Sequence, residues 1–151
     1  LRNAGADVIL TRSDDTYISL DERAAILREA SPDLSVSVHQ NSMPYTADIT
    51  SIRGTFSLWW ADAGRMLAES LSETIPDALS RQNRGTEKMM LAMCKNQKFP
   101  SSLVEVGFIT SAEEYETMVS GDGIEKTADA LLESIILYFE KQATFADQQG
   151  W

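Results

Sequence analysis

The chain has 151 residues, and its 43% hydrophobic and 24% charged content excludes an intrinsically disordered protein. Its 13 basic and 23 acidic residues give a net charge of −10, which argues against nucleic acid or an anionic membrane surface as a partner, because both need a basic patch. No apolar run approaches the roughly 20 residues of a membrane span, so we expect one globular domain without such a span.

The first part of the chain alternates short strands with a helix. Residues 8–10 are apolar and predict a short strand. Ser19 and Glu22 have the spacing of a capping box and predict a helix that begins there and ends at Pro32. Residues 34–39 alternate between apolar and polar side chains, which predicts a second strand.

The rest of the chain continues this alternation. The expected elements are, in chain order, a loop over 40–53, a strand over 54–60, a helix from 62 to just before Pro76, a polar connection over 77–87, strands over 89–93 and 103–108, a helix over 111–119 that Ser111 and Glu114 open with a second capping box, a turn over 121–123, a helix over 124–138 and a loose tail over 143–151. This order indicates an α/β domain over 1–142, with a mostly parallel sheet and helices on both faces. In such sheets the functional groups lie just beyond the carboxyl ends of the strands.

Two polar residues stand out at strand positions. His39, the only histidine, ends its strand on the polar side, where a metal ligand, a catalytic group or an exposed strand-end histidine would each fit. Glu105 interrupts the apolar run over 103–108, where an unpaired carboxylate would cost on the order of 3 kcal/mol or more. We therefore expect Glu105 to be ion-paired, protonated, near a metal or at a solvent-filled cleft, and such carboxylates cluster at active sites.

Other notable residues have simpler structural explanations. Arg12 and Arg23 suggest an ion-pair cluster that holds a loop to the following helix. One of these arginines, or Arg84, could also pair with Glu105, which is the structural alternative to a catalytic role. The lone Cys94 has no Cys/His nucleophile pattern around it and is expected to fill the core.

Four motifs in this order resemble the zinc-dependent N-acetylmuramoyl-L-alanine amidases. The matching segments are 5–12 with Asp15 and 20–23, similar to "GAxVxLTRxxD…LxxR"; 37–42, similar to "SIHxNA"; 54–60, similar to "GxxxYY"; and 84–85 with 103–111 and Glu114, similar to "RG…LVExGFxSNxxE". The resemblance implies a twisted, mostly parallel sheet flanked by helices. It also implies hydrolysis of the amide between N-acetylmuramic acid and the L-alanine of peptidoglycan.

The resemblance assigns roles to three residues. His39 matches a zinc ligand, Glu105 matches the catalytic glutamate, and Asn41 matches a residue beside the ligand that would orient the loop or a substrate group. The family supplies two more zinc ligands, a His and a Glu, from a strand and a helix ahead of the segment that residues 5–12 resemble. We therefore expect an amidase domain without its N-terminal strand and helix, in which Zn²⁺ is bound weakly at His39 or not at all.

The first functional hypothesis is a peptidoglycan hydrolase that acts outside the cytoplasm, at the cell wall or in the periplasm, as a monomer whose partner is peptidoglycan. The resemblance fits an autolysin, a sporulation enzyme or a phage endolysin equally. The alternative is a non-catalytic wall-binding or regulatory relic of the same fold. A third hypothesis is an unrelated α/β protein in which Glu105 is merely ion-paired.

Overall fold

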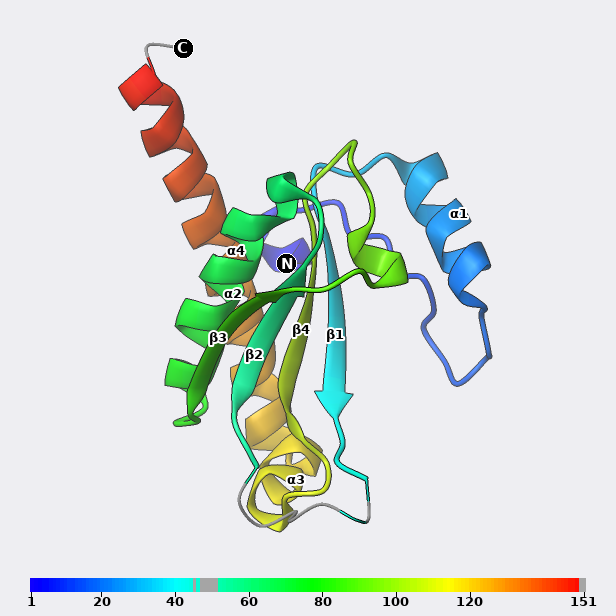
Figure 1. Ribbon diagram of the computed structural model, residues 1–151, viewed down its shortest axis with the longest axis vertical. Coiled ribbons are helices and arrows are strands. Elements are labelled where there is room, and N and C mark those ends of the chain that lie inside the picture. Colours follow the sequence, from blue (N-terminus) through cyan, green and yellow to red (C-terminus); the bar gives the residue numbers. More distant parts are fainter. Residues whose placement is uncertain (45, 47–51, 150–151) are drawn as a thin grey trace.

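Four strands form one sheet in the order β1-β4-β2-β3 (Figure 1). Their bounds are Ser35–Asn41 for β1, Thr55–Trp59 for β2, Asn83–Lys88 for β3 and Ser101–Phe108 for β4. β1 is parallel to β4 and β2 is parallel to β3, whereas β2 and β4 are antiparallel. This computed structural model, which describes residues 1–44, 46 and 52–149, therefore confirms the expected α/β fold with a mostly parallel sheet.

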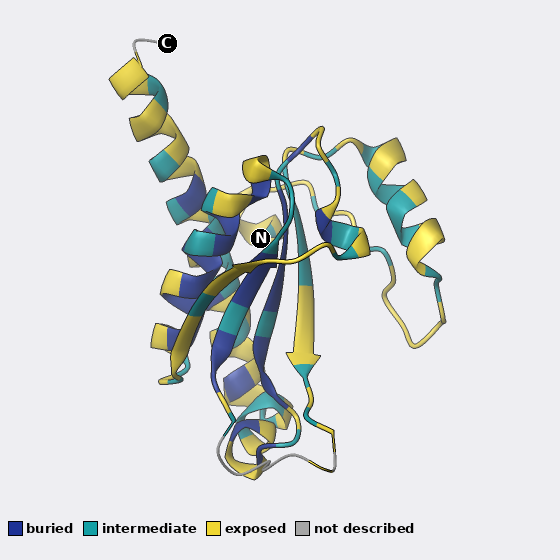
Figure 2. Ribbon diagram, in the orientation of Figure 1, coloured by how far each residue is buried: buried dark blue, intermediate teal, exposed yellow. Residues whose placement is uncertain are grey.

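Helices α2 and α4 lie side by side over one face of the sheet (Figure 1). The helices are α1 (Leu20–Ala30), α2 (Arg65–Ala78), α3 (Ala112–Val119) and α4 (Gly121–Gln149), and short 3₁₀ turns occur at Arg2–Ala4, Asp62–Gly64 and Ala92–Cys94. The main core lies between α2, α4 and the sheet, and it consists of Leu67, Leu71, Ile75, Val104, Val106, Ala130 and Tyr138. In Figure 2 the buried residues gather on β2, on β4 and on these two helices. Because side chains alternate along a strand, the residue between Val104 and Val106 on β4 points to the other face.

The opposite face of the sheet has a smaller cover. Leu58, Cys94 and Leu103 form a second cluster there, which confirms the expected burial of Cys94. The 3₁₀ turn Ala92–Cys94 packs on β4, and α1 lies outside that turn without burying a residue. β1 is an edge strand whose residues are half-buried or exposed. The face that β4 turns toward this cluster is therefore open to solvent near β1.

Two strand predictions are wrong. Residues 8–10 pair with no described strand and form none, so Ile9 and Leu10 remain exposed. Residues 89–93 also form no strand; the remaining strand is β3, inside the segment that was expected to be a polar connection over 77–87. β3 is an edge strand with mostly exposed side chains, so no apolar alternation marks it in the sequence.

Helix α2 continues past its predicted end at Pro76. A proline lacks the N–H that would bond to the carbonyl four residues earlier, which here belongs to Ser72. That carbonyl oxygen instead accepts a hydrogen bond from Nδ2 of Asn83 at 2.5 Å. The substitute bond from a neighbouring strand lets the last turn of the helix include Pro76.

Two predictions at the C-terminal end are also corrected. The expected turn over 121–123 is the first turn of α4, and the Ser120 hydroxyl caps this helix by accepting a hydrogen bond from the Gly123 N–H at 3.0 Å. The expected loose tail over 143–151 is helical as far as Gln149, the last described residue.

Part of the loop expected over 40–53, namely 45 and 47–51, lies outside the described residues. None of the described helices is long and apolar enough to cross a membrane.

Candidate active site

His39 and Glu105 are direct neighbours in the sheet. In the parallel pair of β1 and β4, His39 stands in register with Glu105, and Phe56 of β2 stands in register with Glu105 on its other side. Registered residues of neighbouring strands project to the same face of a sheet. The two candidate residues, 66 positions apart in the sequence, therefore share the face opposite α2 and α4, close to the exposed edge that β1 forms.

Glu105 keeps one carboxylate oxygen without a partner. Its Oε2 is buried and accepts no hydrogen bond from any described residue, and burial raises the pKa of the Glu105 carboxyl above its ordinary value. Ser57 Oγ and Trp59 Nε1 also lack partners among the described residues, but neither carries a charge. Glu105 therefore has an acceptor site open to a proton, a water molecule or a cation.

The structural alternative of an ion pair at Glu105 finds no support among the described residues. Arg12 lies 3.8 Å from Asp15, and Arg23 donates to the carbonyl of Ile18 at 3.0 Å and to the Thr11 hydroxyl. Arg84 donates to the carbonyl of Arg53. The expected ion-pair cluster is reduced to the pair of Arg12 and Asp15 within the loop, and Arg23 joins the loop to α1 through hydrogen bonds instead.

The surroundings of His39 favour its neutral form. Desolvation by the surrounding atoms, and to a lesser degree the positive charge of Arg23, lower the pKa of the His39 imidazole. The imidazole is therefore uncharged at neutral pH and keeps a nitrogen lone pair, as a metal ligand must.

Asn41 ends β1 just past an irregularity in the pairing with β4 that begins at His39. Its carbonyl accepts from the Ile109 N–H at 2.8 Å, and its side-chain Oδ1 accepts from the Ser42 N–H at 2.7 Å. The Asn41 side chain is thus engaged with the backbone at the start of the following loop.

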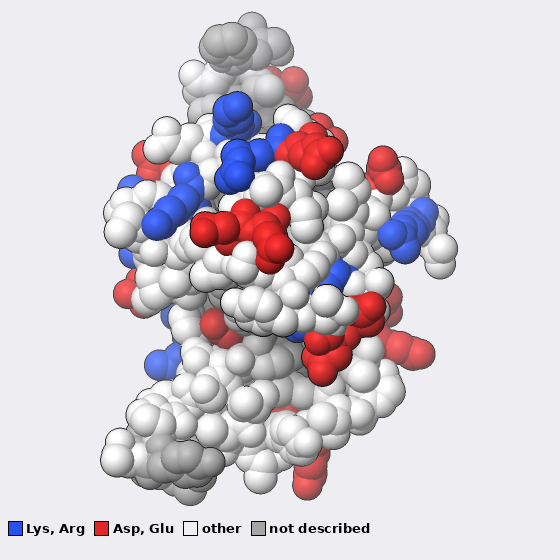
Figure 3. All heavy atoms as spheres, turned by 90° about the vertical axis from the view of Figure 1, so that its right-hand side faces the viewer, with Lys and Arg blue, Asp and Glu red and all other residues white. Residues whose placement is uncertain are grey.

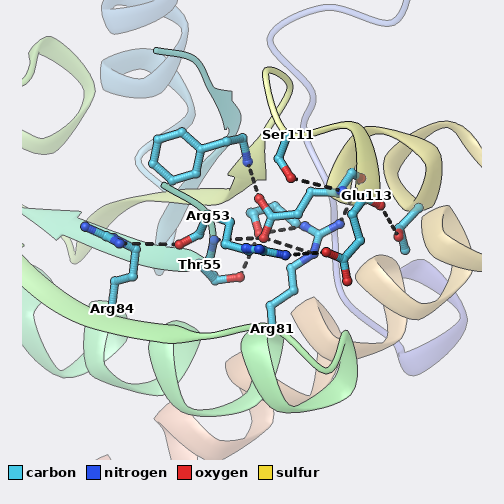
Figure 4. Close-up of polar contacts among 11 residues, drawn as sticks. Arg53, Thr55, Arg81, Arg84, Ser111 and Glu113 are labelled. Atoms are coloured by element: carbon cyan, nitrogen blue, oxygen red, sulfur yellow. Dashed lines mark hydrogen bonds and ion pairs between the residues drawn. The ribbon is translucent and has the colours of Figure 1, made fainter. Parts of the chain in front are cut away.

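A buried ion pair at the end of β4 escaped the sequence interpretation (Figure 4). The side chains of Arg81 and Glu114 are each 5% exposed, with Nε and Oε1 3.9 Å apart. Glu114 Oε2 accepts from the Phe108 N–H at 2.7 Å, and Oε1 accepts from the Gly54 N–H at 2.8 Å. Arg81 Nη1 donates to the Val106 carbonyl at 2.7 Å. Burial lowers the pKa of Arg81, and the charge of Glu114 opposes that shift.

The second capping box is therefore only half formed. The Ser111 hydroxyl accepts from the Glu114 N–H at 3.5 Å, as predicted, but the Glu114 carboxylate turns toward Phe108 and Gly54 rather than back to Ser111. The first capping box is complete, because Glu22 Oε2 accepts from the Ser19 N–H at 2.8 Å and the Ser19 hydroxyl accepts from the Glu22 N–H. The difference lies in the surroundings, since Glu22 is exposed and Glu114 is buried.

Two described residues have the chemistry that a zinc site uses. His39 offers a neutral imidazole, and Glu105 on the neighbouring strand has an unpartnered buried oxygen. Across residues 1–44, 46 and 52–149, however, no three or more His, Cys, Asp or Glu side chains lie together as a metal would need. The imidazole and the carboxylate are groups that zinc centres use, but two side chains are fewer than the three or four ligands that zinc needs.

Comparison with known proteins gives a consistent picture. A family model described as N-acetylmuramoyl-L-alanine amidase matches residues 1–136. The uncharacterized protein YqiI of Bacillus subtilis is 30% identical over 145 residues, which cover 93% of this chain and 68% of YqiI. The N-acetylmuramoyl-L-alanine amidase LytC of the same organism is 30% identical over 139 residues, 92% of this chain but only 28% of LytC.

Solved structures agree with these relatives. The N-acetylmuramoyl-L-alanine amidase AmiC2 of Nostoc punctiforme superimposes with a TM-score of 0.83 at 28% identity, over 92% of this chain and 76% of that one. An N-acetylmuramoyl-L-alanine amidase from Clostridium difficile 630 has a TM-score of 0.81 at 26% identity, over 89% of this chain and 72% of that one.

Proposed function

Because this chain belongs to the N-acetylmuramoyl-L-alanine amidase family, we propose that it hydrolyses the amide between N-acetylmuramic acid and L-alanine in peptidoglycan. The observation that carries this proposal is the registered pair of His39 and Glu105 on the open face of the sheet. An imidazole beside a carboxylate with an unpartnered oxygen is the part of a hydrolytic centre that a metal and a water molecule would complete.

Each of the three residues has a role in this proposal. His39 would be one ligand of a zinc ion, which when bound supplies a Lewis acid for the scissile carbonyl and acidifies a water molecule. Glu105 would take the proton of the attacking water and return it to the leaving nitrogen. The raised pKa of Glu105 brings the carboxyl closer to the range in which it can both accept and release a proton near neutral pH. Asn41 would orient the loop after β1 or a group of the substrate.

We propose further that these 151 residues alone hold zinc weakly at His39 or not at all, since a tight site needs three or four protein ligands. The second candidate function is a non-catalytic wall-binding or regulatory relic of the same fold. Zinc analysis of the complete gene product separates the two, because an enzyme would hold close to one equivalent and a relic would hold none.

We propose peptidoglycan as the partner, a monomer as the acting state, and the cell wall or the periplasm as the place of action. LytH of Staphylococcus aureus, 29% identical over 140 residues, is described as a probable cell wall amidase, and the match covers 45% of its length. The net charge of −10 gives no general attraction to anionic wall polymers. On the face that β1 and α1 present, acidic and basic side chains are interspersed (Figure 3). We therefore propose that wall targeting depends on the substrate pocket or on a separate binding module.

The test uses the complete gene product with zinc, purified peptidoglycan, and detection of newly released L-alanine amino groups. We expect Glu105→Gln to lower the rate by about 10²- to 10⁴-fold while the protein keeps its zinc, which is the usual loss when a general base is removed. His39→Ala is expected to lower the zinc content as well as the rate. The matched control is Glu113→Gln, an exposed carboxylate on α3, which should change neither. Full activity of Glu105→Gln, or normal zinc content in His39→Ala, would contradict the proposed roles.

A further inference from the structure

We propose that Glu114 and Arg81 are positioning residues for Glu105: their buried ion pair holds the peptide groups that follow Glu105 on β4 and so fixes where its carboxylate stands. This inference rests on the proposed function, in which Glu105 is the catalytic carboxylate. It assigns a task in the reaction to two residues that touch neither the reacting atoms nor a metal ligand.

The backbone near Glu105 needs support because regular strand pairing ends there. The antiparallel ladder between β2 and β4 has its last registered pair at Phe56 and Glu105. On the other side, the parallel ladder between β1 and β4 becomes irregular directly after the pair of His39 and Glu105. β4 nevertheless continues to Phe108. The segment that carries the candidate base therefore lies where the ladder with β2 ends and the ladder with β1 is interrupted, to resume only at the pair of Asn41 and Phe108.

Side chains take over the hydrogen bonds that the ladders no longer supply (Figure 4). The carbonyl of Val106, the residue after Glu105, accepts from Arg81 Nη1 at 2.7 Å and from the Thr55 hydroxyl at 2.6 Å. Two residues further on, the Phe108 N–H donates to Glu114 Oε2 at 2.7 Å. Bonds to charged groups are stronger than those between neutral groups, so this part of β4 is held firmly.

The ion pair also connects three separate parts of the fold at this point. Glu114 belongs to α3, its Oε1 accepts from Gly54 just before β2, and Arg81 lies between α2 and β3. The packing is close: a Cβ added to Gly107 would lie 2.5 Å from Arg81 Nη1 and 3.0 Å from Glu114 Oε2. The ion pair therefore packs directly against β4 at Gly107. We infer that loosening it loosens the backbone beside Glu105.

A small displacement matters for proton transfer. A general base acts only when its oxygen lies within hydrogen-bond reach of the water it deprotonates, and a misplacement of about 1 Å lowers the rate by roughly 10²-fold. Loosening the ion pair should therefore reduce kcat and leave substrate binding, and so KM, largely unchanged. A purely structural role would instead reduce the amount of folded protein and leave the kcat of the folded molecules as it was.

The experiment compares Glu114→Gln and Thr55→Val with the matched control Glu113→Gln in the zinc-loaded gene product, at a temperature where all variants are folded. Glu113 is one residue from Glu114 on α3, but its carboxylate is exposed and pairs with Arg53. The measurements are kcat and KM on soluble peptidoglycan fragments, and the NMR amide signals of Glu105 and Val106. Thr55→Val removes only the second hydrogen bond to the Val106 carbonyl and keeps the side-chain shape, so it decides the question if Glu114→Gln does not fold.

We expect kcat to fall by about 10- to 100-fold in Glu114→Gln and by a smaller factor in Thr55→Val, with KM unchanged and with both amide signals shifted. The control should match the parent protein. Unmoved amide signals in both variants would overturn the proposal whatever happens to kcat, and so would shifted signals with an unchanged kcat. Glu105→Gln distinguishes failure of the proposed function from failure of this inference. If that variant remains active, the proposed function is wrong, and the amide signals still show whether Glu114 positions this segment.

Discussion

Two carboxylates near the end of β4 show how opposite environments divide the tasks of one site. Glu114 is 5% exposed and accepts hydrogen bonds from two backbone N–H groups beside the charge of Arg81. Glu105 is half-buried, has a raised pKa and keeps one oxygen without a described partner. The charge of Glu114 holds three elements together, whereas the unpartnered oxygen of Glu105 is left for the proposed chemistry.

The largest expected effect comes from removing the satisfied carboxylate. Glu114→Ala leaves the Arg81 guanidinium buried without a counter-charge and frees two backbone N–H groups, so we expect the free energy of unfolding to fall by about 3–5 kcal/mol. Glu113→Ala, which removes an exposed partner of Arg53, should cost less than about 1 kcal/mol. Urea unfolding of the two variants measures the difference. Equal losses would mean that the buried pair is no more important than a surface pair.

Cys94 extends the comparison to a buried thiol that has only weak backbone partners. Its thiol lies beneath the face that carries Glu105, 3.6 Å from the Leu58 carbonyl, and burial raises the pKa of Cys94 to about 11. An exposed thiol has a pKa of about 8.5, so at about pH 8 the thiolate fraction, and the alkylation rate with it, should be roughly 200-fold lower in the folded protein. Iodoacetamide labelling in the native state and in urea checks this. Rapid labelling of the native protein would show that this face opens easily.

The sequence predicted most of the interior and missed parts of the edges. β4 and the helices α2 and α4 were expected, although with different ends, because their apolar side chains repeat at strand or helix spacing. β3 was missed because an edge strand with exposed Asn, Arg, Glu and Lys side chains has no such pattern. The strand predicted over 8–10 was wrong for the opposite reason. An apolar run indicates a tendency to form a strand, but it does not show that a neighbouring strand is there to pair with it.

The sequence pointed to the two candidate residues and not to the contacts that support them. His39 and Glu105 are polar residues at strand positions, and this break in the apolar pattern marks them in the sequence itself. Glu114 followed the pattern of a capping box, so its sequence position suggested a local bond to Ser111. Its actual partners, Gly54, Phe108 and Arg81, are fixed by tertiary contacts that no local pattern contains.

A smaller loss is expected from crowding the buried ion pair without changing its charge. A Cβ at position 107 would meet Arg81 Nη1, Met118 Cε and Glu114 Oε2 at 2.5, 2.7 and 3.0 Å, so Gly107→Ala should lower the free energy of unfolding by about 1–3 kcal/mol. Gly121→Ala is the matched control, because a Cβ there would meet nothing within 4 Å. Thermal unfolding of both variants gives the comparison. Unchanged stability of Gly107→Ala would show that the segment after Glu105 yields easily.

The smallest effect concerns Glu105 itself and has the opposite sign. Burial raises the folded-state pKa of Glu105 above its ordinary value of 4.5, so its charged form is less favourable in the folded protein than in the unfolded chain. The contribution of Glu105 to the free energy of unfolding is therefore most favourable below about pH 4, where the carboxyl is protonated in both states. It becomes less favourable as the pH rises through the folded-state pKa. Glu105→Gln removes this loss. With metal withdrawn by a chelator, the variant should match the parent near the acidic end and exceed it by about 1 kcal/mol at neutral pH, the cost of one half-buried unsatisfied group. Urea unfolding across this pH range measures the gain, and a variant less stable than its parent at neutral pH would mean that Glu105 contributes to the fold as Glu114 does.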